Sequence, residues 1–235
     1  MNRRTFLAGT ATTGLAGVAG CLDVLGESHG ATEDVVLDPP DRYEDLRASR
    51  DNGYLPYPIH GDELPEVSVP DVTADGPVST RQFVGDRHVL LTFVFTRCNT
   101  VCPTLTSSFA QVQHDARENG YAEDIALLPT TFDPAYDTPE RLVTFAEDVG
   151  ADPSAANWRI LRPESPERAE AVVEGEFGVI FSRVPEEKRE MENMVWNHRS
   201  SRILANKDGY VERNYRSSLN AAGLLDEVAT LRERW

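Results

Sequence analysis

Hydrophobic residues form three short runs that alternate with segments of helical periodicity between about residues 54 and 235. The runs are "HVLLTFVFT" (88–96), "DIALLPTTF" (124–132) and "NWRILRP" (157–163). Short, nearly continuous runs rich in Val, Leu, Ile and Phe are typical of strands buried on both faces. We therefore predict three core strands.

Helical spacing of apolar residues follows each of these strands. Two of the helices have clear start signals, because Thr138 precedes Pro139 and Ser165 precedes another proline, and Ser or Thr before Pro is a favoured helix N-terminus. The predicted helices are 103–120, 137–150, 165–178 and 219–235, with a shorter one near 43–50.

A strand, turn and return strand are predicted over 200–215, because Asp208-Gly209 is a strong turn signal between two apolar runs. A short β-hairpin is expected earlier, over 64–86. Strands alternating with helices indicate an α/β sheet covered on both faces, and the late hairpin makes that sheet mixed. This is the layout of a thioredoxin-like domain over 54–235, with a central mixed sheet flanked by helices and an N-terminal β-hairpin extension.

The net charge of the chain indicates the kind of environment in which the protein works. The formal net charge is -16, and among 23 basic residues only Lys188 and Lys207 are lysines. At molar ionic strength the Debye length falls to about 3 Å, which screens the self-repulsion of such an acidic surface. We therefore expect a salt-adapted (halophilic) organism, and nucleic acid is excluded as a partner because its phosphates repel this surface.

The first 21 residues have the pattern of an export signal. Arg3-Arg4 precede a weakly apolar stretch rich in small residues, which ends in "VAGC" at Cys21. Twin arginines before such a stretch are typical of twin-arginine export, and the ending resembles a lipobox, whose cysteine becomes the lipid anchor. Residues 1–21 are thus expected to be a signal and lipobox, and 22–53 an acidic flexible tether. The protein is expected at the outer face of the cytoplasmic membrane.

The remaining two cysteines, Cys98 and Cys102, lie in "FTRCNTVCPT" between the first core strand and its helix. A disulfide that closes so short a loop would stabilise the fold little, so a chemical function is favoured over a structural one. A helix N-terminus favours thiolate over thiol, and two thiolates prefer Cu(I), Zn(II) or similar ions. Reversible oxidation and metal binding both fit this spacing.

A metal site would need a further ligand, and histidine is the natural one. His198, in "MVWNHRSSRI", precedes the late hairpin, and in this topology that loop faces the cysteine-bearing end of the helix. The five histidines are His29, His60, His88, His114 and His198.

Three other residues have two interpretations each. Met191 and Met194 form an M-x-x-M pair that is either two ordinary hydrophobic residues or a pair of thioether ligands for Cu(I). Asp133, at the end of the second core strand, either caps the next helix or orients groups around the cysteines.

Three motifs resemble those of the Sco/SenC family, the thioredoxin-fold copper chaperones of the respiratory chain. They are "FVFTRCNTVCPT", "TFDPAYDTPERL" and "WNHRSSRILANKDGYV", and the resemblance covers about 55–235. It implies that Cys98, Cys102 and His198 bind copper, as Cu(I) or Cu(II). It also implies delivery of that copper to the binuclear copper site in a subunit of a haem-copper (cytochrome c) oxidase. We expect a monomer that is not an enzyme.

The chain departs from the family pattern at several positions, while the Cys and His residues are all present. Asn99 replaces a proline, Asn197 replaces an acidic residue, Arg199 follows the histidine, and Lys207-Asp208 replaces Asp-Pro. Two alternatives stay open: a thiol-disulfide oxidoreductase that reduces the cysteines of a client copper site, and a redox sensor.

Overall fold

The computed structural model describes residues 34–216 and 221–235. The expected signal, Cys21, His29 and the first part of the tether lie outside the described residues. The helices are α1 (Tyr43–Asp51), α2 (Val101–Glu118), α3 (Pro139–Asp148), α4 (Pro166–Glu170) and α5 (Ala221–Arg232). The strands are β1 (Ser68–Pro70), β2 (Pro77–Ser79), β3 (His88–Val94), β4 (Ile125–Thr131), β5 (Phe181–Arg183), β6 (Trp196–His198), β7 (Arg202–Ala205) and β8 (Val211–Tyr215).

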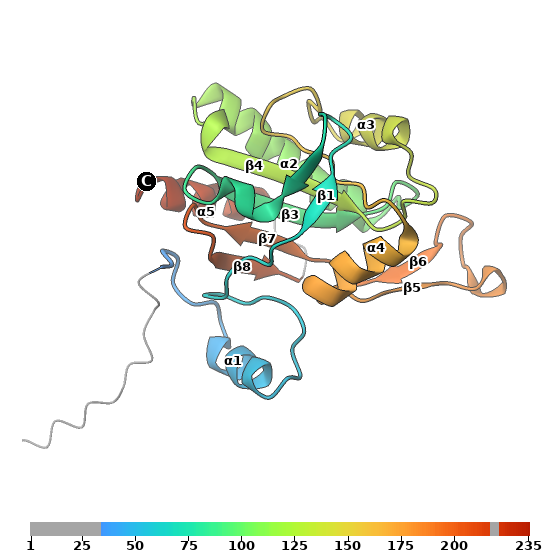
Figure 1. Ribbon diagram of the computed structural model, residues 1–235, viewed down its shortest axis with the longest axis horizontal. Helices are drawn as coiled ribbons and strands as arrows, with labels where there is room; N and C mark the ends of the chain where they lie inside the picture. The colour runs from blue at the N-terminus through green and yellow to red at the C-terminus, as the bar shows by residue number, and fades with distance from the viewer. Residues whose placement is uncertain (1–33, 217–220) are drawn as a thin grey trace, which may run out of the picture. The chain divides into compact units, whose positions relative to one another are not determined.

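A four-stranded sheet in the order β4-β3-β7-β8 forms the centre of the domain (Figure 1). β3 runs parallel to β4 and antiparallel to β7, and β7 pairs antiparallel with β8. The mixed α/β sheet and the late hairpin are therefore confirmed. The early hairpin is confirmed as well, since β1 and β2 pair antiparallel.

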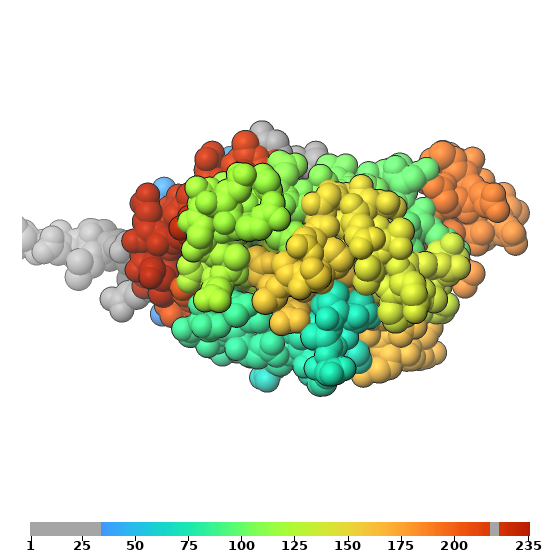
Figure 2. Space-filling model, turned by 90° about the horizontal axis from the view of Figure 1, so that it is seen from above, coloured from blue at the N-terminus to red at the C-terminus, as the bar shows by residue number. Residues whose placement is uncertain are grey.

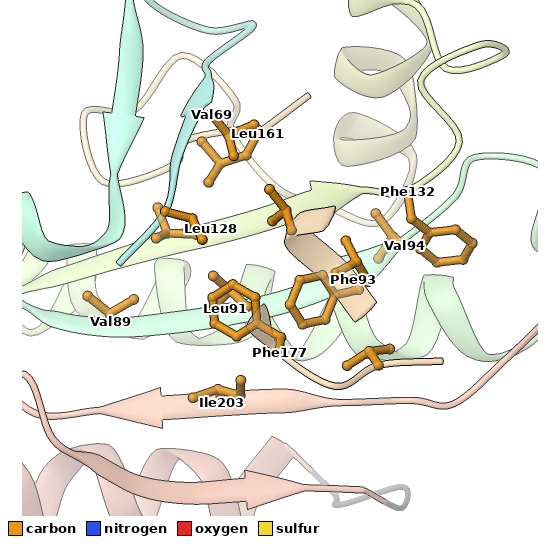
Figure 3. Packing of buried hydrophobic residues seen from close by; sticks show 14 of the residues in the cluster. Val69, Val89, Leu91, Phe93, Val94, Leu128, Phe132, Leu161, Phe177 and Ile203 are labelled. Carbon is orange, nitrogen blue, oxygen red and sulfur yellow. The ribbon is translucent and has the colours of Figure 1, made fainter. Parts of the chain in front are cut away.

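Alternating side chains of the sheet enter two separate hydrophobic clusters. Leu90 and Leu127 face α2 and α5, where Phe109 and Val228 cover them. The other face is covered by β1, β2 and the segment after α4, as Figure 3 shows for a cluster that includes Val69, Val89, Leu91, Leu128, Leu161, Phe177 and Ile203. Both faces of β3 and β4 are buried, which explains why these strands are nearly continuous apolar runs.

The predicted third core strand, 157–163, is only partly formed. It runs beside β4 through two isolated bridges, Leu127 with Trp158 and Thr130 with Leu161. Pro129 lies between these bridges and has no amide hydrogen, so one hydrogen bond of the parallel ladder cannot form. The segment is therefore an extended edge rather than a continuous strand.

The predicted helix 165–178 is also shorter than expected. Ser165 caps α4 by accepting a hydrogen bond from the Arg168 amide, as predicted, but the chain continues as a π-helical turn, Ala171–Glu176. Beyond it, β5 and β6 form an antiparallel pair that the sequence pattern did not indicate. In Figure 2 this pair and its connecting loop form an orange lobe at the right-hand edge of the view.

Part of the segment predicted as a flexible tether, 22–53, packs on the domain. The helix near 43–50 is confirmed as α1, and Leu37 is packed in the domain core. The buried carboxylate of Glu212 accepts hydrogen bonds from the amides of Val36 and Leu37. The chain is thus attached to the domain from about Val35 onward. Across the described ranges, no helix has the length and hydropathy needed to cross a membrane.

Candidate metal centre

The two cysteines lie at the junction of β3 and α2. Cys98 is in the turn after the strand, where its amide donates to the Phe95 carbonyl. Cys102 is in the first turn of α2, and its amide donates to Cys98 Sγ over 3.4 Å. Both are free thiols and are buried. The expected juxtaposition at a helix N-terminus is therefore confirmed, with Cys98 just before the helix rather than inside it.

His198 reaches the same place from the far end of the chain. It is the last residue of β6, and pairing with Phe181 of β5 fixes its register. Its Nε2 lies 3.9 Å from Cys102 Sγ, and Sγ of both cysteines and a ring nitrogen of His198 all lie within 4.8 Å of one another. The loop before the late hairpin does face the cysteines, as the topology predicted.

Aromatic side chains hold the imidazole in place. The ring of His198 packs against Phe95 and Phe132, with centroid distances of 5.6 and 5.1 Å. Phe132 in turn contacts Phe181 and Trp196, which come from the β5–β6 pair. His198 Nδ1 lies 3.4 Å from the Arg199 carbonyl. With a metal bound, a proton on Nδ1 would donate there and leave the Nε2 lone pair as the ligand. In the free site, a proton on the ring nitrogen that faces the sulfurs would instead stabilise the Cys98 thiolate.

The two thiols differ in acidity. A hydrogen bond from the Cys102 side chain, helped by bonds from His198 and Thr100, lowers the pKa of Cys98 to about 3 against the opposing effect of burial. Burial raises the pKa of Cys102, and the neighbouring Cys98 raises it further. In the free site these opposite shifts favour the thiolate form at Cys98 and the thiol form at Cys102.

Alkylation of the reduced protein should reveal this difference. Because the Cys98 pKa lies far below the assay range, Cys98 is a thiolate throughout, and its reaction with iodoacetamide is expected to have a flat rate from pH 5 to 8. Cys102 is expected to stay unmodified over that range. Peptide mapping by mass spectrometry measures both, with urea-unfolded protein as the control. A Cys98 rate that rises about tenfold per pH unit, as for an ordinary thiol of pKa ~8.5, would contradict the assignment.

Two buried carboxylates lie on the loop after β4. Asp133, the residue singled out in the sequence, forms an ion pair with Arg97, so its carboxylate is already engaged. Asp137 is fully buried and accepts hydrogen bonds from the side chains of Thr96 and Thr131. Burial raises the pKa of Asp137, and its charge raises the pKa of Cys102. Asp137 is thus a carboxylate whose charge acts on the Cys102 thiol, and sequence reasoning missed it although it lies in "DPAYDTP".

The other described histidines have different environments. His60 is buried and its Nδ1 lies 3.0 Å from the Glu212 carbonyl, while His88 is buried against Trp235. His114 is exposed on α2 beside Glu118. Among the described residues, one cluster of His, Cys, Asp or Glu has the proximity that a metal ion needs, and it is Cys98, Cys102 and His198.

Comparison with known proteins agrees with this architecture. The SCO1/SenC family model matches residues 72–233. A SCO1 protein homolog of Bacillus subtilis is 30% identical over 126 residues, which cover 54% of this chain and 60% of that protein. A protein of Stutzerimonas stutzeri, named as a candidate copper-binding protein, is 36% identical over 86 residues. The match covers 35% of this chain and 39% of that protein. This chain therefore aligns with less than two thirds of either relative.

A solved structure supports the same relationship. The SCO1/SenC family lipoprotein of Bacillus anthracis has a TM-score of 0.59 and 26% identity, over 74% of this chain and 97% of that one. The fold is that of a thioredoxin-like domain. Its candidate metal site consists of two thiols, which are soft ligands, beside a histidine. Because the family model spans more than half of its residues, the chain belongs to the SCO1/SenC family.

Proposed function

We propose that this protein is a copper chaperone that binds one copper ion through Cys98, Cys102 and His198. The observation that supports this best is the convergence of two thiol sulfurs and an imidazole nitrogen within 4.8 Å. Two sulfur ligands and one nitrogen suit soft Cu(I) and accept Cu(II). The relative named as copper-binding supports the choice of metal.

The unequal burial of the ligands suits a site that both binds and releases a metal ion. Cys102 is fully buried at the base, whereas His198 is half-buried and its neighbours Asn197 and Arg199 are exposed. Copper would therefore enter and leave on the histidine side. By the family resemblance, we propose that the recipient is the binuclear copper site of a haem-copper oxidase.

We also propose that the chain is exported and anchored to the outer face of the membrane. The Arg3-Arg4 signal over 1–21 and lipidation at Cys21 would provide this anchor. Because Val36 and Leu37 are attached to Glu212, the segment from Cys21 to about Val35 would serve as the tether, about 50 Å at most when fully extended. Such a tether would keep the metal site close to a membrane-bound client.

Removing the histidine ligand tests the metal site. In the reduced full-length chain, His198→Ala is expected to weaken copper binding by more than about 100-fold, because it deletes one of three ligands, whereas changes outside the ligand set typically cost 10–100-fold. Competition with a chromogenic Cu(I) chelator and the thiolate-to-Cu(II) absorption band measure it. His114→Ala, which removes an exposed histidine from α2, is the control and should bind one equivalent.

A second function, thiol-disulfide exchange, is favoured by the unequal acidity of the two thiols. A thiolate at Cys98 beside a thiol at Cys102 is the arrangement of an attacking and a resolving cysteine. If His198→Ala holds copper as tightly as the unmodified chain, the chaperone proposal fails. If the variant also reduces a model disulfide at the unmodified rate, the oxidoreductase becomes the better proposal.

A further inference from the structure

Apart from Met1, the chain has two methionines, and both lie in one turn of the β5–β6 lobe. The amide of Met194 donates to the carbonyl of Met191, so Met191 to Met194 form a hydrogen-bonded turn. Such a turn holds the first and fourth Cα atoms within about 7 Å. Two thioether side chains on a turn of this size can reach one metal ion.

Both methionines are partly exposed. Met191 is 44% exposed and Met194 is 38% exposed. The neighbouring Val195 is buried instead, and backbone bonding of Val184 to Val195 closes the loop. Both methionine side chains therefore keep part of their surface accessible to solvent.

The loop is also close to the proposed ligand His198 along the chain. β6 begins two residues after Met194 and ends at His198, so at about 3.3 Å per residue the Met194 and His198 Cα atoms are at most about 13 Å apart. The loop over 184–195 contains four glutamates against Lys188 and Arg189. Negative charge beside soft thioethers raises the local concentration of a soft cation.

We propose that Met191 and Met194 form an outer Cu(I) capture site that passes the ion to Cys98, Cys102 and His198. This inference rests on the proposed copper function and adds the route by which copper enters. Copper remains Cu(I) throughout. The bonds to the two thioether sulfurs break as bonds to two thiolates and the imidazole form, and the thiol proton of Cys102 leaves to water.

The kinetic test compares loading rates. Reduced full-length chain is mixed with the Cu(I)–bicinchoninate complex, and loss of the complex's colour is followed by stopped flow. Met191→Leu/Met194→Leu keeps the size and apolar character but removes both sulfurs. It is expected to load about tenfold more slowly and still reach one equivalent, because capture raises the on-rate and not the final affinity. Equal rates within twofold would overturn the proposal.

Ile180→Ala is the matched control, because Ile180 is a sulfur-free exposed apolar residue just before β5, 54% exposed. It should load at the unmodified rate. If Ile180→Ala slows loading and the double leucine variant does not, the lobe acts by its apolar surface and the proposal is wrong.

An equilibrium test separates this inference from the copper function itself. Cys98→Ser/Cys102→Ser removes the inner site, Cys21→Ser removes the remaining thiol of the chain, and Ag(I) serves as a redox-inert probe of soft-ligand sites. One weakly held Ag(I) that disappears when Met191→Leu/Met194→Leu is added supports the capture site, and Ag(I) binding that survives overturns it. If the unmodified chain takes up no copper, the chaperone function fails, and the Ag(I) result alone decides whether the thioether site exists.

Discussion

Oxidation of Cys98 and Cys102 to a disulfide is expected to abolish copper binding, and reduction to restore one equivalent. The reason is that copper needs deprotonated thiols as ligands, and a disulfide has none. The two side chains are close enough to react, with Cys98 already a thiolate beside Cys102. Copper content after oxidation, gel filtration and re-reduction measures the effect. Thiol redox state would then determine whether the site can be loaded.

Variants with a single serine substitution are the controls, because each keeps one cysteine of the pair and cannot form the Cys98–Cys102 disulfide. Cys98→Ser and Cys102→Ser should each bind copper weakly, and this residual binding should not respond to the oxidant. An oxidised chain that still binds one equivalent would place the metal elsewhere and refute the site. Circular dichroism of every sample confirms that the fold is retained.

Gly178→Ala is expected to destabilise the domain by about 2–4 kcal/mol. Gly178 has φ of +61°, in the left-handed region that is unfavourable for residues with a Cβ. A Cβ there would lie 2.5 Å from the carbonyl carbon of Pro56 and 2.6 Å from the Tyr57 amide nitrogen, and both are backbone atoms that cannot rotate away. Urea unfolding with linear extrapolation measures the difference in the free energy of unfolding.

Gly175→Ala is the matched control in the adjoining π-helical turn. A Cβ on Gly175 meets nothing closer than 4.0 Å, and its φ is not in the left-handed region. Its free energy of unfolding should stay within about 1 kcal/mol of the unmodified value, or rise, since alanine favours helical backbone. Equal destabilisation of the two variants would contradict the close approach of 56–57 to Gly178.

The candidate site was predictable to the extent that it depends on local signals. The apolar run before Cys98 predicts a buried strand, and the spacing to Cys102 at a helix start predicts that the sulfurs converge. The capping residues Thr138 and Ser165 also begin helices as expected, since both accept amide hydrogen bonds from residues three positions on. These features follow from interactions between residues near one another in the chain.

Features that depend on distant contacts were not predictable in the same way. β5 and β6 are three residues each, too short and too mixed in character to show periodicity, and they form because Phe181 and Trp196 pack on Phe132. The acidic segment around Val36 looks like a tether until Glu212, 176 residues away, accepts its amide hydrogen. Pro129 lies in an apolar run that reads as an ordinary strand, although its missing amide hydrogen interrupts pairing with 157–163.

By itself the sequence determined the α/β class, the helix starts, the two thiols at the strand–helix junction and, through family motifs, the histidine that would join them. Tertiary structure alone decided the positions of His198, Asp137 and the exposed methionine turn. The physical reason is that strand pairing and burial are properties of segments far apart in the chain. Only the folded domain brings an imidazole from β6 to 3.9 Å from a sulfur on α2 and buries both cysteines between strand and helix.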